Sequence, residues 1–146
     1  IFLNNKNVEL DIRKLDVSNL VSPIATIPEV REKLVAQQQQ MGLEKGVVMD
    51  GRDIGTVVFP NAELKIFMTA SPEVRAQRRL NELEGKGEMV SFQEVIDNLK
   101  HRDHMDETRK ESPLSQAENS RVLDNSNITR EEQLYMVKNW VSELMK

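Results

Sequence analysis

Short apolar runs and longer helical patterns alternate along the chain. Apolar runs of only a few residues, bounded by glycine, proline or polar residues, are typical of buried strands. Three such runs cover residues 47–49, 64–68 and 122–123. Each run is followed first by polar residues and then, further along the chain, by a helical pattern. This alternation predicts an α/β fold with a parallel sheet.

Four places in the sequence carry the signals that begin a helix. A hydroxyl residue followed three positions later by glutamate predicts a capping box, and this pattern begins at three residues: Thr26, Ser91 and Thr129. Residues 71–73, Ser-Pro-Glu, supply an N-cap hydroxyl, a proline and an acid for a first turn. We expect helices to begin at all four places. A shorter helix over 15–20 is expected to end before Pro23.

Two further segments are predicted to be extended. Weak alternation over residues 1–12, with Asn4-Asn5 in between, favours a hairpin. Residues 56–59 read as a short extended piece that stops at Pro60.

One face of the helix that follows Ser91 changes from apolar to charged along its length. Its apolar positions are Phe92, Val95, Ile96 and Leu99. The same face, continued at helical spacing, carries Arg102, Asp106 and Arg109. This charged row either lines a ligand cleft, where it would suit phosphates and sugar hydroxyls, or forms intrahelical ion pairs. The sequence supports both interpretations equally.

The first apolar run ends in Asp50-Gly51-Arg52-Asp53-Ile54-Gly55-Thr56. In open α/β sheets, ligands bind beyond the carboxyl ends of the strands. An Asp-Gly pair alone is equally consistent with a plain polar turn. Two carboxylates and an arginine within four residues favour a binding function.

Two further sets of polar side chains are weaker candidates. Arg75, Arg78 and Arg79 have the spacing that puts three guanidinium groups on one helix face, and such faces are usually solvated. His101 and His104 could hold a metal by spacing, but no third ligand follows on that face, so we interpret them as surface residues.

The composition excludes several classes of function. The 146 residues have a formal net charge of −4, which gives no general attraction for nucleic acid. Cysteine is absent, which excludes disulfides and thiolate metal sites. The apolar runs are too short to span a membrane. We expect neither nucleic acid nor a membrane as a partner.

Taken together, these motifs closely resemble those of bacterial cytidylate kinases. The resemblance rests on residues 50–60 and 64–67, on Arg102-Asp103 with Asp106 and Arg109, and on Leu123-Asp124. It implies a P-loop kinase fold, with part of an NMP-binding insert over 1–45 and the kinase core over 46–146, including a short lid around 78–92. It also implies a cytoplasmic monomer that transfers the γ-phosphoryl group of ATP, with Mg²⁺, to CMP or dCMP.

The resemblance also implies a role for individual residues. Ser22, Arg31 and Asp53 would read the cytosine, Arg52 would hold the CMP phosphate, and Asp106 would bind the ribose hydroxyls. Arg102 and Arg109 would hold the phosphates during transfer, with Arg78 and Arg79 as catalytic lid arginines. Asp50 would be an outer-sphere Mg²⁺ carboxylate. Residues Asn125, Ser126 and Asn127 would lie against the adenine of ATP, although the family more often carries Thr or Ser at the first of these positions.

One family motif does not occur in the sequence, namely the Gly-x-x-x-x-Gly-Lys-Ser/Thr loop that cradles the ATP phosphates. The similarity therefore covers the C-terminal two-thirds of the family pattern, with the P-loop strand missing, and we expect this chain alone to lack kinase activity. A non-catalytic pyrimidine-nucleotide-binding or regulatory module is the main alternative, and a structural protein with solvated charged rows is another. Retained CMP binding without a response to ATP would favour the binding module.

Overall fold

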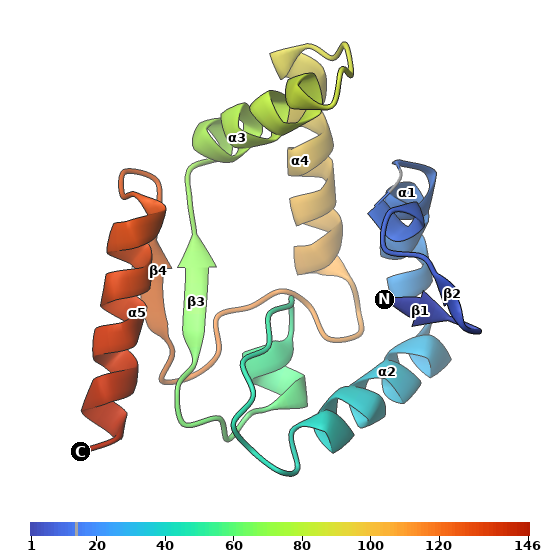
Figure 1. Cartoon of the computed structure of the whole chain (residues 1–146). Helices are drawn as coiled ribbons and strands as arrows, with labels where there is room; N and C mark the ends of the chain where they lie inside the picture. Colours follow the sequence, from blue (N-terminus) through green and yellow to red (C-terminus); the bar gives the residue numbers. More distant parts are fainter. Residues whose placement is uncertain (14) are drawn as a thin grey trace.

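The computed structural model describes the backbone of residues 1–13 and 15–146, and the side chains of this range except at positions 13, 15, 16, 18, 19 and 22. Helices lie around a small two-stranded sheet and around an irregular segment in the middle of the chain (Figure 1). None of the helices in the described part of the chain is both long and apolar enough to cross a membrane.

The sheet pairs two of the three predicted strands. Strand β3 (Ile66–Thr69) runs parallel to β4 (Arg121–Asp124), with Ile66 opposite Arg121 and Thr69 opposite Asp124. Leu123 is fully buried, as expected of the apolar centre of a short strand. The fold is therefore α/β with a small parallel sheet, as the alternating pattern predicts.

The strand predicted over residues 47–49 does not form. These residues have no regular structure, and the side chain of Val48 is fully exposed. A strand needs a hydrogen-bonded neighbour, and within the described residues β3 and β4 pair only with each other. The apolar pattern alone could not reveal this lack of a neighbour.

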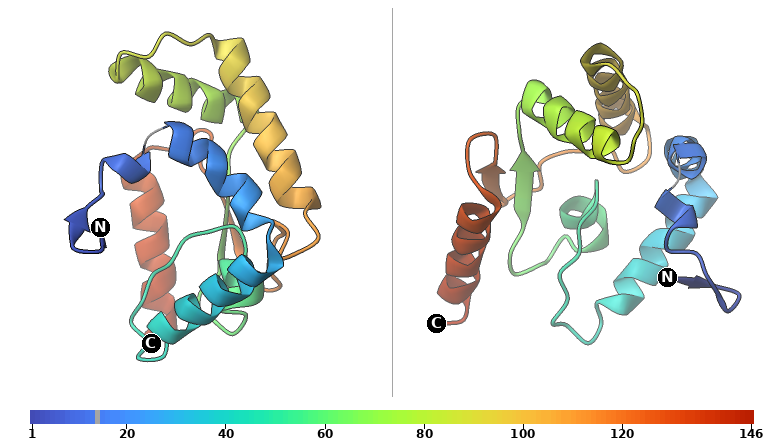
Figure 2. Two further views of the ribbon diagram at one scale, coloured as in Figure 1. Left: turned by 90° about the vertical axis from the view of Figure 1, so that its right-hand side faces the viewer. Right: turned by 45° about the horizontal axis from the view of Figure 1, so that its top comes forward.

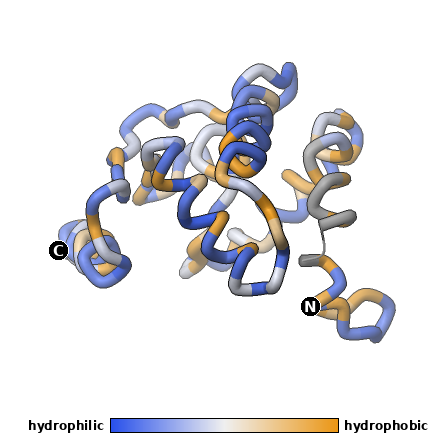
Figure 3. Tube along the Cα trace, turned by 90° about the horizontal axis from the view of Figure 1, so that it is seen from above, coloured by the Kyte–Doolittle hydropathy of each residue, from blue (hydrophilic) through white to orange (hydrophobic). Residues whose placement is uncertain are grey.

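The N-terminal hairpin is confirmed. Strands β1 (Phe2–Leu3) and β2 (Lys6–Asn7) pair in antiparallel fashion. Asn4 and Asn5 both have positive φ angles, of 49° and 64°, as a tight hairpin turn requires of its two central residues. In Figure 3, hydrophobic positions drawn in orange lie beside the N-terminus, where Phe2 and Leu3 are exposed.

Helix starts are mostly where the capping signals put them. Ser71 caps α3 (Pro72–Gly85), and full capping boxes open α4 (Phe92–Thr108) and α5 (Arg130–Leu144). Arg121 of β4 ties α5 to the sheet, because it forms an ion pair with Glu143 at 2.7 Å and lies 5.3 Å from the centre of the Trp140 ring. The helix-start signals therefore predict three of the five α-helices correctly.

The prediction was wrong around Pro23 and Thr26. After the short 3₁₀ turn η1 (Asp11–Arg13), helix α1 (Leu15–Ala25) continues through Pro23, which lies in its last turn. The Thr26 hydroxyl donates to the carbonyl of Pro23 at 2.7 Å and therefore does not cap the next helix. Helix α2 (Pro28–Met41) begins without a side-chain cap, with its proline in the first turn as expected.

Helices α3 and α4 lie side by side and share a small core (Figures 1 and 2). Its four buried residues are Ala76 and Leu83 of α3 with Val95 and Ile96 of α4. Leu99 packs against this core and Phe92 is partly exposed, so the predicted apolar stripe is mostly buried.

Residues 54–58 form a π-helix, η2 (Ile54–Val58), where an extended piece was predicted over 56–59. The carbonyl of Asp53 accepts from the N–H groups of Val57 and Val58, and the N–H of Phe59 donates to Ile54 at 2.7 Å. These local bonds replace strand pairing. Single π-turns are rare and often lie at functional sites.

Candidate functional site

The centre of the site is the segment immediately before η2, and it is tied first to α2. Asp53 is 3% exposed, and its carboxylate accepts a hydrogen bond from Nη2 of Arg31 on α2. The Nε of Arg31 is buried and has no hydrogen-bond partner among the residues that the structure describes. A buried donor without an acceptor is costly, so this N–H is an unsatisfied donor at the centre of the site.

The preceding residue ties the same segment to α4. Nε of Arg52 donates to Oδ2 of Asp106 at 2.9 Å. Asp106 is buried, whereas the Arg52 side chain is about half exposed. Adjacent residues of one segment therefore pair with two different helices, which lie on either side of it in Figure 1.

Arg109, at the end of α4, completes a cluster of five charged side chains, which are those of Arg31, Arg52, Asp53, Asp106 and Arg109. Its Nε and Nη2 both donate to the carbonyl of Ser112, at 2.8 and 2.5 Å, and its Nη1 lies 3.9 Å from Oδ1 of Asp106. Ser112 has a positive φ angle of 51°, which turns the chain back toward the helix. The side chain of Arg109 is thus fixed by a backbone carbonyl.

The charges of this cluster act on one another. Burial is the main cause that lowers the pKa of Arg109, and the nearby guanidinium of Arg31 lowers it further. The carboxylates of Asp106 and Asp53 oppose this effect, and Arg52 adds to it. The five side chains therefore form one electrostatic unit with three positive and two negative groups.

The charged row of α4 is explained only in part by intrahelical pairs. Asp106 makes its short contact with Arg52, and its contact with Arg109 is at the limit of an ion pair. Arg102 is half-buried, and among the described residues no ion pair or hydrogen bond engages its side chain. Within the described part of the chain, the row thus leaves one guanidinium group, that of Arg102, without a protein partner.

The three arginines of α3 do not act as one face. Each contacts a different partner: Arg75 contacts Asp103, Arg78 contacts Asn125, and Arg79 contacts Glu82. The spacing correctly put them on the same helix, but their partners lie on α4, in the loop after β4 and on α3 itself.

The side chains of Asn125 and Ser126, in the loop after β4, already have partners within the protein. The amide of Asn125 accepts from Arg78 at 2.8 Å and donates to Gln133 at 2.9 Å. Oγ of Ser126 donates to Asp124 and accepts from the backbone N–H of Ser71. The hydroxyl of Ser126, and after it the backbone N–H of Ser126, lower the pKa of Asp124 by donating to its carboxylate. Asn127 is exposed.

The remaining predicted residues lie outside the cluster. Asp50 is exposed, and the side chain of Ser22 lies outside the described residues. His101 and His104 are exposed, as expected of surface residues. No group of three metal-binding side chains occurs in the part of the chain that the structure describes.

Two contacts in and beside the cluster could not be predicted from the sequence motifs. Asp103, which pairs with Arg75, is separated from it by 28 residues, so no local pattern connects them. The Ser112 carbonyl that fixes Arg109 is a backbone group. The only signal for it was the nearby Pro113, which indicates a turn after the helix.

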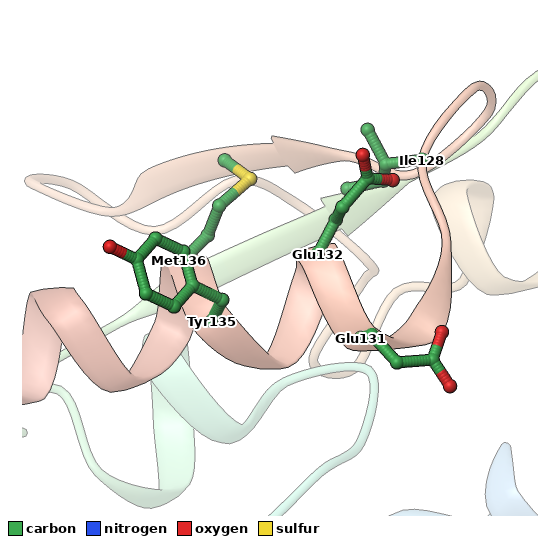
Figure 4. Close-up of a pocket in the computed structure, with 5 residues that line it drawn as sticks. All are labelled: Ile128, Glu131, Glu132, Tyr135 and Met136. Atoms are coloured by element: carbon green, nitrogen blue, oxygen red, sulfur yellow. The ribbon is translucent and has the colours of Figure 1, made fainter.

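A shallow hollow on α5 is separate from the charged cluster. Its lining residues are Ile128, Glu131, Glu132, Tyr135 and Met136, and Figure 4 shows them around the first turns of the helix. Glu132 already serves the capping box of α5. No residue of the charged cluster lines this hollow.

Comparison with known proteins identifies the family. The family described as Cytidylate kinase matches residues 1–143. This chain belongs to the cytidylate kinase family. Three similar relatives, each described as a cytidylate kinase, come from Parabacteroides distasonis (60% identical over 97% of this chain), Flavobacterium johnsoniae (55% over 100%) and Porphyromonas gingivalis (57% over 97%).

The chain spans 60% of the length of the Parabacteroides and Porphyromonas cytidylate kinases and 64% of the Flavobacterium enzyme. Cytidylate kinases are phosphotransferases, so the match agrees with the family expected from the motifs. The roles expected for individual residues of the cluster remain predictions.

Proposed function

We propose that the complete protein transfers the γ-phosphoryl group of ATP to CMP or dCMP, and that the charged cluster binds the acceptor nucleotide. The observation that carries this proposal is the Arg31–Asp53 pair, in which a largely buried guanidinium keeps one N–H without an acceptor among the described residues. Cytosine offers two acceptors, a carbonyl and a ring nitrogen, next to an amine donor. An arginine and a carboxylate match this pattern.

The rest of the cluster suits the ribose and the phosphate. Asp106 can accept from ribose hydroxyls, and Arg52 and Arg109 beside it can donate to phosphate oxygens. Arg102 offers a further guanidinium without a protein partner among the described residues. Phosphoryl transfer requires positioning and neutralisation of charge more than covalent chemistry, so an arginine-rich acceptor site fits this reaction.

ATP would bring Mg²⁺, and the carboxylate that this chain offers is suited to contact the metal through a water molecule. Mg²⁺ keeps several waters and takes only one or two carboxylates when phosphates supply the other ligands. Asp50 is an exposed carboxylate two residues before Arg52 and could hold such a water. The metal would neutralise charge on the transferred phosphoryl group.

Residues 125–127 are proposed to lie against the adenine through their backbone, because the side chains of Asn125 and Ser126 already have protein partners. Arg78 would reach this loop from the lid, because it donates to both the side chain and the carbonyl of Asn125. The lid roles of Arg78 and Arg79, and that of Ser22 at the base, follow from the family resemblance alone.

Calorimetric titration of this chain with CMP tests the acceptor site. We expect Arg31→Gln and Asp53→Asn to weaken CMP binding at least about tenfold, since each removes one charge of the buried pair that would contact the base. Lys33→Gln, on the exposed side of the same helix, is the matched control and should bind as the parent does. Equal affinity in all four proteins would contradict the proposed base site.

Discrimination between nucleotides is a second readout of the same site. UMP carries a carbonyl where CMP has its amine, and this carbonyl would face the Asp53 carboxylate. We expect UMP to bind at least about tenfold more weakly than CMP, and Asp53→Asn to reduce the difference. Formation of CDP by the complete protein on addition of MgATP would test the transfer step itself.

A further inference from the structure

A charged pair outside the acceptor cluster joins α3 to α4. Nη1 of Arg75, in the first turn of α3, donates to Oδ1 of Asp103 at 3.0 Å and lies 2.8 Å from Oδ2. Nε of the same guanidinium donates to the carbonyl of Ala70 at 3.2 Å, one residue beyond the end of β3. One planar group therefore connects the end of a strand, the start of α3 and the middle of α4.

No other side-chain hydrogen bond or ion pair connects these two helices within residues 72–108, all of which the structure describes. The other ion pairs of α3 stay on that helix or its cap, since Arg79 and Lys86 both contact Glu82. The apolar contacts of Ala76, Leu83, Val95 and Ile96 hold the helices together. Apolar packing tolerates small sliding motions better than a forked hydrogen bond does.

The strand end that Arg75 contacts is itself fixed to the loop after β4. The N–H of Asn125 donates to the carbonyl of Thr69, and the N–H of Ser71 donates to Oγ of Ser126, both at 2.9 Å. The corner at Ala70 therefore has a defined position in the sheet. Asp103 attaches α4 to this corner through Arg75.

Asp103 lies on α4 between two residues of the proposed acceptor site, next to Arg102 and one turn before Asp106. A helix is rigid over one turn, so the position of Asp103 determines where these two side chains lie. We propose that Arg75 and Asp103 are positioning residues that set Arg102 and Asp106 against the carboxyl end of the sheet. This inference rests on the proposed function, because it assigns the pair to the same acceptor site.

The test measures CMP affinity of the whole chain by calorimetry. We expect Asp103→Asn and Arg75→Gln each to weaken binding about tenfold, since a misplacement of about 1 Å can cost up to a hundredfold. The double variant should be no weaker than either single one. Arg75→Lys should recover part of the affinity, because lysine can restore the ion pair but not the fork to Ala70.

Asp97→Asn is the matched control, since it removes a carboxylate from the same helix that accepts from Gln93 on α4 and from no other described residue. It should leave CMP affinity unchanged. The pair is one third exposed, so thermal midpoints should fall by less than about 3 °C in every variant. Unchanged affinity in Asp103→Asn, or a loss that Asp97→Asn shares, overturns the proposal.

A readout that needs no nucleotide separates this inference from the proposed function. In ligand-free protein, the ¹⁵N–¹H signals of Nε should shift for Arg102 and for Arg52, whose Nε donates to Asp106, in Asp103→Asn and not in Asp97→Asn. If the parent chain fails to bind CMP but these shifts occur, the acceptor-site proposal fails and the positioning role stands. Unshifted signals overturn the positioning role whatever CMP does.

Discussion

The buried Arg31–Asp53 pair can be tested by removing its negative charge alone. Asp53→Asn keeps the shape of the side chain and one acceptor oxygen for the Arg31 guanidinium. The side chains of the two residues are only 14% and 4% exposed, so water cannot replace the lost charge. The change therefore isolates the electrostatic part of the interaction.

The expected magnitude follows from this burial. Removing one partner of a buried ion pair costs about 3–5 kcal/mol, because an uncompensated charge stays in a medium of low polarity. The carboxylate of Asp53 also opposes the repulsion that Arg31 and Arg52 exert on Arg109. Without its charge, three guanidinium groups would be left with one carboxylate. We expect a loss of at least about 3 kcal/mol in the free energy of unfolding.

Urea unfolding, followed by the fluorescence of the single tryptophan, Trp140, measures this loss. With a slope of about 2 kcal/mol per molar urea, the midpoint should fall by about 1.5 M. The control is the double variant Arg31→Met/Asp53→Leu, which removes both charges of this pair and should recover most of the stability. It should not recover CMP binding.

Two results would refute the reasoning. A midpoint for Asp53→Asn within about 0.3 M of the parent would mean that the pair contributes as little as an exposed one. A double variant as unstable as Asp53→Asn would mean that shape, and not charge, determines the cost.

Three further predictions concern packing, pH and the phosphate side of the site. Gly42→Ala should destabilise the protein by about 1–3 kcal/mol, because the added Cβ would lie 2.4 Å from Cε1 of the Phe59 ring; Phe59→Leu in the same chain should restore most of the urea midpoint. Hydrogen bonds from Ser91 hold the pKa of Glu94 below its ordinary value, so its stabilising effect is present above the ordinary carboxyl pKa and lost as the pH falls through the lowered one. Thermal midpoints measured from about pH 7 to about pH 3 should therefore fall less steeply in Glu94→Gln than in the parent. Arg109→Lys should weaken CMP binding about tenfold in calorimetry, because an ammonium group cannot reproduce the forked contact of the guanidinium; unchanged affinity would exclude a role for the fork.

Local signals predicted the helices better than the strands. The capping residues Ser71, Ser91 and Thr129 each satisfy backbone N–H groups within three residues, so nothing distant is needed to place the helix start. Thr26 failed for an equally local reason, since a competing acceptor at Pro23 takes its hydroxyl. The prediction of a strand over residues 47–49 failed because a strand depends on a hydrogen-bonded neighbour, whose position in the sequence no local pattern gives.

Site residues were predictable by type but not by pairing. The sequence puts Arg102, Asp106 and Arg109 on one helix face, which the structure confirms for the pair at 106 and 109. The contact of Asp106 with Arg52 spans 54 residues, and no periodicity connects the two. Such pairs follow from tertiary packing, which a one-dimensional pattern does not contain.

Arg52 and Asp53 show why the segment before η2 is suited to an acceptor site. They are adjacent, yet one pairs with Asp106 on α4 and the other with Arg31 on α2. A shift of either helix would move Arg52 or Asp53 with it. Because these two residues share a peptide bond, the ion pair with the other helix would then be strained. If α2 reads the base and α4 holds the ribose and phosphate, as proposed, this shared segment sets the distance between the two ends of the nucleotide. A binding site built in this way would recognise the length of its ligand as well as its charges.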